Sequence, residues 1–186
     1  MRTRILITGL LAMILTGFGQ VAMAADSGFF FSTKIGSTKV DGGGFNDSAI
    51  SVHPSFGYDF NDVWGIELGY DNFGKPDDTC GAGCFIKLKD ATGFSLRVIG
   101  TMPLNDDWSL YGSAGWQHWK LKAKITDQGV VTFLPSEDGD EFVIGVGVKV
   151  MAIPKWNLRF RAGFDYFEAD SVDISTFYIG AEKKFH

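Results

Sequence analysis

The sequence lacks the features that mark a helical membrane protein, a disordered chain or a nucleic-acid-binding protein. Beyond residue 24 it has no apolar run of 18 residues, which argues against a transmembrane helix. Only 5 of the 186 residues are proline and no low-complexity segment occurs, so the 24 glycines do not indicate disorder. The net charge is −5 without a basic cluster, which makes nucleic acid a poor candidate partner. Abundant glycine with 15% aromatic residues is instead typical of a membrane β-barrel.

The first 24 residues have the pattern of a secretory signal peptide. Arg2 and Arg4 precede an apolar stretch from Ile5 to Phe18, and Ala22-Met23-Ala24 is the small-x-small pattern that signal peptidase cleaves. The apolar stretch is too short for a transmembrane anchor, and no lipoprotein-type cysteine follows it. We therefore expect a signal peptide at 1–24 and an exported domain at 25–186.

Apolar and polar residues alternate through most of the remaining chain. Leu158, Phe160 and Ala162, for example, alternate with Arg159 and Arg161. A period of two is the signature of a β-strand with two different faces. Eight segments show it, at 28–39, 49–60, 63–73, 85–101, 108–125, 139–151, 156–169 and 174–185.

The connections between these segments differ in length. Short turns are expected at residues 61–62, 103–107 and 152–155, whereas longer polar stretches lie at 41–48, 74–84 and 126–138, and a further short connection lies at 170–173. Short turns at one end and longer loops at the other are typical of outer-membrane barrels. The pattern therefore predicts an all-β fold, an eight-stranded antiparallel up-and-down transmembrane β-barrel.

A soluble β-sandwich or a lipocalin-like barrel would also show alternation, but with its apolar face inside. The polar face here carries full charges such as Glu67 and Arg97, opposite a face of large apolar residues. Aromatic residues gather in two bands, with Trp64, Trp108 and Trp156 beside the short turns and Tyr70, Phe73, Trp119, Tyr166 and Phe167 towards the longer loops. Two such bands resemble interfacial girdles. Together with the signal peptide and the terminal aromatic Phe185, they favour the bacterial outer membrane.

Several segments closely resemble the transmembrane domain of OmpA-type proteins. The run Phe56-Gly57-Tyr58-Asp59, followed by Trp64-Gly65-Ile66-Glu67-Leu68-Gly69-Tyr70-Asp71-Asn72-Phe73-Gly74-Lys75, is similar to the second and third strands of that family. Residues 93–107, 111–119 and 143–167, with Pro103 and Pro154 in turns, are similar to its later strands. The resemblance implies an eight-stranded barrel without the hinge and peptidoglycan-binding domain of longer members, so no wall-tethering role is expected.

The resemblance also implies an interior closed by ion pairs. In that family a carboxylate at the position of Glu67 faces an arginine at the position of Arg159. The second pair of the family is altered, because Lys149 replaces an expected glutamate and Ile99 replaces an expected lysine. Arg97 lies on the same face as Ile99, so we expect an interior richer in positive charge.

The side chains expected in this interior network are Glu67, Arg97, Lys149, Arg159, Arg161, Asp165 and Glu182. Buried charges are costly unless they are paired, and Glu67 with Arg159, and Asp165 or Glu182 with Arg97, Arg161 or Lys149, would satisfy this requirement. The lumen of so small a barrel is just wide enough to be filled by side chains. A plugged interior is therefore favoured over a narrow or gated ion path.

Cys80-Gly81-Ala82-Gly83-Cys84 lies in an expected outer loop. Two cysteines in an exported chain favour a disulfide, which would pin the loop tip. A metal or redox pair is the alternative, but a C-x-x-x-C motif without a nearby histidine is a weak metal signal. We expect no metal ion and no cofactor.

The three histidines, His53, His118 and His186, raise the hypothesis of a lipid-modifying barrel enzyme. Such an enzyme needs a serine and a carboxylate around a histidine at the outer rim. Ser51, His53 and Ser55 share one strand face, but no acidic residue lies near them in the sequence, and His118 has the parity of the lipid-facing residues. We therefore interpret these as interfacial or lumen histidines and expect no catalytic residue.

Lys120, Lys122 and Lys124 continue one face of a strand beyond the expected bilayer. At mid-membrane each lysine would cost ~2–4 kcal/mol. Above the bilayer they are equally compatible with contacts to lipopolysaccharide phosphates and with an ordinary solvated extension of the strand.

Three functional hypotheses follow. The first is a monomeric structural or surface-interaction barrel in contact with outer-membrane lipid and lipopolysaccharide, with loops open to a host or phage ligand. The second is a narrow or gated pore for ions or small solutes. The third, and least favoured, is a lipid-modifying enzyme.

Overall fold

The computed structural model describes residues 27–42, 45–81, 84–127, 130–169 and 172–185. The predicted signal peptide lies outside the described residues. No helix in these ranges is long and apolar enough to cross a membrane. The strands are β1 (Gly28–Gly42), β2 (Phe45–Asp59), β3 (Trp64–Asn72), β4 (Asp77–Gly81), β5 (Cys84–Pro103), β6 (Trp108–Asp127), β7 (Val130–Phe133), β8 (Glu137–Ile153), β9 (Leu158–Ala169) and β10 (Val172–Phe185), with a 3₁₀ turn, η1 (Pro154–Trp156).

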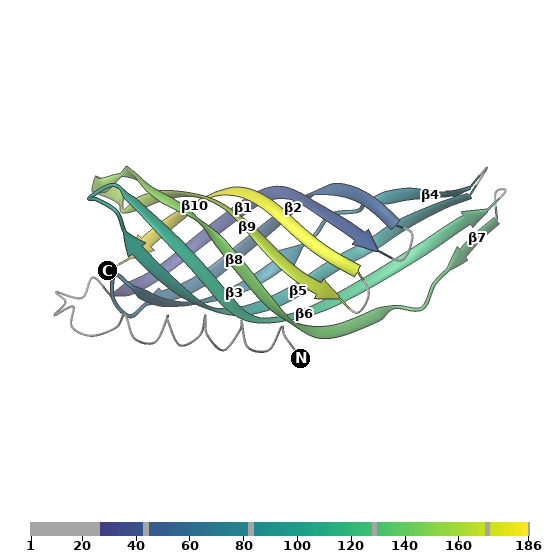
Figure 1. Cartoon of the computed structure of the whole chain (residues 1–186), viewed down its shortest axis with the longest axis horizontal. Helices are drawn as coiled ribbons and strands as arrows, with labels where there is room; N and C mark the ends of the chain where they lie inside the picture. Colours follow the sequence, from purple (N-terminus) through teal and green to yellow (C-terminus); the bar gives the residue numbers. More distant parts are fainter. Residues whose placement is uncertain (1–26, 43–44, 82–83, 128–129, 170–171, 186) are drawn as a thin grey trace, which may run out of the picture.

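The strands form one closed antiparallel barrel (Figure 1). Neighbours around the wall follow the order β5, β3, β2, β1, β10, β9, β8 and β6, and pairing of β5 with β6 closes the ring. The first and last strands lie side by side from Phe29–Phe185 to Asp41–Asp173, so all eight wall strands have two neighbours. The predicted eight-stranded barrel is confirmed, and its closure satisfies the backbone polar groups as a membrane requires.

The remaining two strands extend the barrel at one end. β5 and β6 are the longest strands, and their far ends carry β4 and β7, which pair with them outside the ring (Figure 1). We call the sheet β4-β5-β6-β7 at this end the outer sheet. Residues 74–84 and 126–138 were expected to be loops, and that expectation is wrong where β4 and β7 form. Likewise β1 and β2 pair up to Gly42 and Phe45, so most of the expected loop at 41–48 is strand.

Asparagine side chains shape two of the short turns at the opposite end of the barrel. Asn61 Oδ1 accepts hydrogen bonds from the backbone N–H groups of Val63 and Trp64, at 2.9 and 2.8 Å. Asn105 Oδ1 accepts from Asp107 and Trp108 in the same way. Such side-chain bonds replace ladder bonds where the chain reverses. Tight turns of this kind are typical of the periplasmic end of outer-membrane barrels.

The two faces of the wall have the reverse of a soluble protein's polarity. Large apolar side chains such as Phe56, Leu96 and Ile179 are exposed on the outside, where lipid covers them. Charged side chains such as Glu67 and Arg161 are buried inside. A lipocalin-like soluble barrel would show the opposite arrangement. The structure therefore excludes the soluble alternative and agrees with an outer-membrane location.

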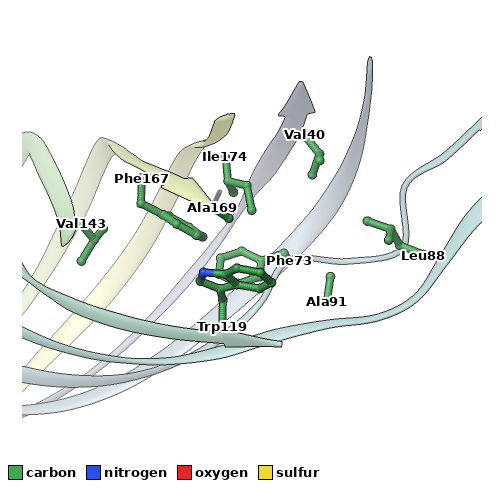
Figure 2. Close-up of a cluster of buried hydrophobic side chains, with 9 residues drawn as sticks. All are labelled: Val40, Phe73, Leu88, Ala91, Trp119, Val143, Phe167, Ala169 and Ile174. Atoms are coloured by element: carbon green, nitrogen blue, oxygen red, sulfur yellow. The ribbon is translucent and has the colours of Figure 1, made fainter. Parts of the chain in front are cut away.

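The predicted aromatic bands are correct at the periplasmic end and only in part at the outer end, where Tyr70 is 39% exposed on the outside. Trp108 and Trp156 are exposed on the lipid side, as a girdle requires. Phe73, Trp119 and Phe167 instead point into the barrel and are at most 3% exposed. They form a buried group that we call the outer apolar cluster, in which Trp119 lies beneath the side chains of the facing strands (Figure 2). Its other members are Val40, Leu88, Ala91, Val143, Ala169 and Ile174.

Candidate functional site

The barrel interior below the outer apolar cluster is filled by charged side chains, which we call the inner charge network. Glu67 on β3 is 2% exposed, and its Oε2 accepts a hydrogen bond from Arg161 Nη1 at 2.6 Å. Its Oε1 accepts another from Lys34 Nζ on β1, at 3.3 Å. The pairing of Glu67 with Arg159, implied by the resemblance, is therefore wrong. Arg159 lies one inward-facing position nearer the periplasm and reaches Glu182 at 3.5 Å.

Glu182 is the second carboxylate of the inner charge network. Its carboxylate lies 3.1 Å from Lys149 Nζ and 3.4 Å from Arg161 Nη1, so Arg161 connects Glu182 with Glu67. Lys149 and Arg161 also lie over the ring of Tyr111, at 5.5 and 4.8 Å from its centroid. Such contacts stabilise a buried cation beyond its ion pairs.

Towards the cell exterior the network continues through Arg97. Its Nη1 donates to Asp165 Oδ2, and its Nη2 lies 3.8 Å from Asp71 Oδ2. Asp71 in turn pairs with His53, whose Nδ1 lies 2.8 Å from Asp71 Oδ1. Tyr178, whose hydroxyl is 2.6 Å from that of Tyr111, also donates to Asp165 at 3.3 Å. The charged groups thus extend without a break from Glu182 to His53.

The expected excess of positive charge is not found among the buried residues that the structure describes. The positively charged residues that replace the expected side chains inside the barrel are balanced by acids that the sequence analysis did not include. Five buried cations, Lys34, Arg97, Lys149, Arg161 and Lys184, face five buried carboxylates, Asp59, Glu67, Asp71, Asp165 and Glu182. Among the described residues of this face, Arg159, which is partly exposed, adds a further cation, and the partly exposed Glu141 adds a further acid.

Sequence reasoning missed five of these buried side chains, Lys34, His53, Asp59, Asp71 and Lys184. The signal for Lys34 was present, because Phe30, Ser32 and Lys34 share the inward parity of β1. The contact between His53 and Asp71 had no local signal. It forms because β2 and β3 are neighbours in the wall, which brings together residues 18 positions apart.

The His53–Asp71 pair does not form the catalytic arrangement that the enzyme hypothesis needs. Ser51, His53 and Ser55 are all buried inside the barrel, away from any outer rim. Ser55 Oγ bonds Ser32 Oγ at 2.6 Å, while Ser51 Oγ and His53 Nε2 have no hydrogen-bond partner among the described residues. A nucleophile and its base need to be linked by a hydrogen bond and open to substrate. His118 is exposed at the outer side of the wall and bonds Asp140 at 2.8 Å.

The outer sheet carries a concentration of lysines. Lys87 on β5 and Lys124 on β6 are direct cross-strand neighbours. Together with Lys75, Lys89, Leu88 and Asp90 they line a recess of about 340 Å³ at the far end of the barrel. Like charges directly opposite each other destabilise a sheet, and the four lysines outnumber the two nearby carboxylates, Asp90 in the recess and Asp77, which pairs in register with Lys87.

Lys120 and Lys122, the other two lysines of β6, have acidic neighbours. Lys122 Nζ lies 3.6 Å from Asp90, and Lys120 pairs in register with Asp138. The three lysines that the sequence grouped together therefore differ, and Lys124 lies where positive charge is least compensated.

The two cysteines flank the tip of the β4–β5 hairpin. Cys80 belongs to β4 and Cys84 begins β5, where it pairs with Gly81. Their side chains lie outside the described residues, so the disulfide stays a prediction. Alkylation of the exported protein without reduction, followed by mass spectrometry, is expected to find neither cysteine labelled. Labelling of both thiols would refute the bond, and prior reduction provides the control.

In sequence, the chain resembles bacterial outer-membrane barrels along its whole length. The model of the family described as the outer membrane protein beta-barrel domain matches residues 8–185. The attachment invasion locus protein of Yersinia enterocolitica is 24% identical over 192 aligned positions, which cover all of both chains. Outer membrane protein A of Shigella flexneri is 27% identical over 179 positions, which cover 89% of this chain and 50% of that protein.

Solved structures share the fold. Neisserial surface protein A superposes with a TM-score of 0.63 at 17% identity, covering 86% of this chain and 99% of that one. The attachment invasion locus protein of Yersinia pestis, solved in complex with the heparin analogue sucrose octasulfate, has a TM-score of 0.59 at 20% identity, covering 88% and 100%. At such identities the structural likeness shows the barrel fold alone.

Proposed function

Because the chain belongs to the outer membrane protein beta-barrel family, we propose that it acts as a surface-binding platform whose outer sheet takes a sulfated or phosphorylated polyanion. It is an outer-membrane barrel, and this role uses the outer sheet, at the end of the barrel opposite the short turns (Figure 1). The observation that carries the proposal is the recess lined by Lys75, Lys87, Lys89 and Lys124. Clustered lysines focus a positive potential that attracts multivalent anions.

Exposed apolar side chains beside the recess support a binding role. Phe133 on β7 is 66% exposed and Phe85 on β5 is 54% exposed, although both lie on the outer sheet beyond the lipid. Lys89 Nζ lies 4.7 Å from the centre of the Phe133 ring. Exposed aromatic residues next to cations are typical of interaction surfaces. A host surface carrying sulfated glycans is the ligand source that fits, given that a relative was solved with a heparin analogue.

Binding to immobilised heparin tests this role. Replacing Lys87 or Lys124 by glutamine is expected to weaken binding about fivefold each at low salt, as expected for the loss of one exposed ion pair. The difference should shrink as ionic strength rises, because salt screens exposed charges. Lys155→Gln, in the periplasmic turn η1, is the matched control and is expected to bind as the unaltered protein does. Equal weakening by all three changes, or binding of uncharged dextran as tight as that of heparin, would refute the role.

Lipopolysaccharide is the second partner that the lysines support. Lys120 and Lys122 lie nearer the bilayer than the recess does, at the level where headgroup phosphates of the outer leaflet occur. Their pairing with Asp138 and Asp90 leaves less positive charge for such contacts than Lys124 has. Lipopolysaccharide contact is therefore a supporting interaction of the platform.

A closed interior and the absence of catalysis complete the proposed role. Paired charges and the outer apolar cluster occupy the lumen in series, which favours a monomeric plugged barrel over a pore. The burial of Ser51 and His53 argues against lipid modification, and relatives named for attachment and invasion support a non-enzymatic role.

A further inference from the structure

An apolar groove crosses the lipid-facing wall over β8, β9, β10 and β1. It consists of two hollows of about 600 Å³ each. Ile35, Ala162 and Ile179 line both hollows, so they form one continuous depression. Its position is separate from the outer sheet and from the interior.

The groove exists because small side chains follow one another across the wall. Ala181 pairs with Thr33 on one side and with Phe160 on the other. In the next row towards the cell exterior, Ala162 pairs with Ile179. Phe160 and Ile179 are both more than half exposed, and they stand above the small residues as walls. Within a bilayer, close packing against small residues is a main source of specific association.

The two ends of the groove differ in chemistry. At the outer end Phe164 and Phe177 close it, with their ring centroids 4.7 Å apart. At the periplasmic end, Lys183 follows Ala181 on the same outward face of β10. Its Nζ donates to the backbone carbonyl of Trp156, an exposed tryptophan of the periplasmic girdle. A lysine on the lipid side is tolerated at this interfacial depth, where its cost falls to about 0–1 kcal/mol.

We propose that this groove binds one glycerophospholipid of the periplasmic leaflet, with an acyl chain along the small residues and the phosphate beside Lys183. The apolar lining of the groove matches an acyl chain. Lys183, at headgroup level at the periplasmic end, matches the phosphate. Lys155 in η1 adds a second exposed cation at this end of the barrel. The acyl chain of the lipid enters the groove from the periplasmic side, because Phe164 and Phe177 close the other end.

A second copy of this barrel fits the groove less well. In a two-fold interface the same patch faces itself. Such a dimer centred on the groove would bring the Lys183 side chains of both copies towards each other at the periplasmic interface, where like charges repel. The lysine therefore favours an anionic headgroup as the occupant.

Native mass spectrometry of the folded protein, released from detergent micelles, provides the test. Phosphatidylglycerol is added, and diacylglycerol with the same chains serves as the probe without phosphate. One phosphatidylglycerol is expected to stay bound per barrel, at least fivefold more often than diacylglycerol. Lys183→Gln is expected to remove about that fivefold preference, as for one lysine at a lipid surface. Ala162→Leu with Ala181→Leu is expected to abolish retention of both probes.

Ala114→Leu is the matched control, because Ala114 is exposed on the lipid side of β6, outside the groove. It is expected to retain phosphatidylglycerol as the unaltered protein does. A phospholipid with a photoreactive acyl chain should label peptides of β9 and β10 in the unaltered protein. It should not label them in the variant with Ala162→Leu and Ala181→Leu, in which the leucines fill the groove. Equal retention in all variants would mean non-specific annular lipid, and a dimer dissociated by the leucine pair would mean a second copy; either result overturns the proposal. The electrophoretic mobility shift of the folded barrel verifies folding of each variant.

Discussion

Replacing Glu67 by glutamine is expected to lower the free energy of unfolding of the barrel by about 3–5 kcal/mol. Glutamine has nearly the same shape, so the change removes charge without opening a cavity. Arg161 at 2.6 Å and Lys34 at 3.3 Å would then lose their shared carboxylate inside the barrel. Breaking a buried pair on one side leaves uncompensated charge, which is far more costly than the pair itself is favourable. Urea-induced unfolding in lipid vesicles, followed by tryptophan fluorescence, measures the loss.

An exposed ion pair provides the control for this expectation. Lys39 and Asp41 lie 2.8 Å apart, with both side chains 47% exposed. Asp41→Asn is therefore expected to change the free energy of unfolding by less than about 1 kcal/mol. Combining Glu67→Gln with Arg161→Met should recover part of the loss, because the unpaired guanidinium is removed as well. If Glu67→Gln and Asp41→Asn lowered the free energy of unfolding equally, burial would not be the reason for the large effect at Glu67.

The barrel itself was predictable because its main signal is local. A period of two along one strand, such as Leu158, Phe160 and Ala162 against Arg159 and Arg161, states that the strand has two different faces. Eight such segments and tight turns suffice to predict closure. Full charges on one face also predict which side faces lipid, because a soluble barrel does not bury so many.

Partner choice inside the barrel was not predictable, because it depends on strand stagger. Arg159 and Arg161 share one face of β9 and differ by a single inward position. The stagger of the closed barrel decides which of them reaches Glu67, and no short sequence pattern records it. The same reason explains why the contact of His53 with Asp71 could not be anticipated.

The outer apolar cluster shows a different kind of error. Phe167 has the parity of Arg161 and Asp165, and that parity already indicated an inward side chain. The position of these aromatic residues near the strand ends led to the prediction of a girdle instead, although position is a weaker signal than parity. β4 was missed because its polar segment resembles a loop, and β7 because its four residues lie inside an otherwise polar stretch. Both are strands because they pair with the long ends of β5 and β6.

Ion conduction through the unaltered barrel is expected to be limited to small and infrequent openings in planar bilayers. The lumen holds two different layers in series, the inner charge network and the outer apolar cluster, of which Figure 2 shows the second. An ion must displace paired charges in the first layer and lose hydration in the second. Removing one layer leaves the other in place, so neither Trp119→Ala nor Arg161→Ala alone is expected to produce a stable conductance.

The combination of Trp119→Ala and Arg161→Ala is expected to give frequent, resolvable openings, because it thins both layers at once. Trp119 is 2% exposed, so its truncation leaves a large void and costs about 3–5 kcal/mol of stability. Trp116→Ala with Arg161→Ala is the matched control, since Trp116 lies on the same strand but is 54% exposed on the outside. That variant should stay closed. A large, steady conductance of the unaltered protein would exclude the plugged interior, and a silent but folded Trp119→Ala/Arg161→Ala variant would show that the seal lies elsewhere.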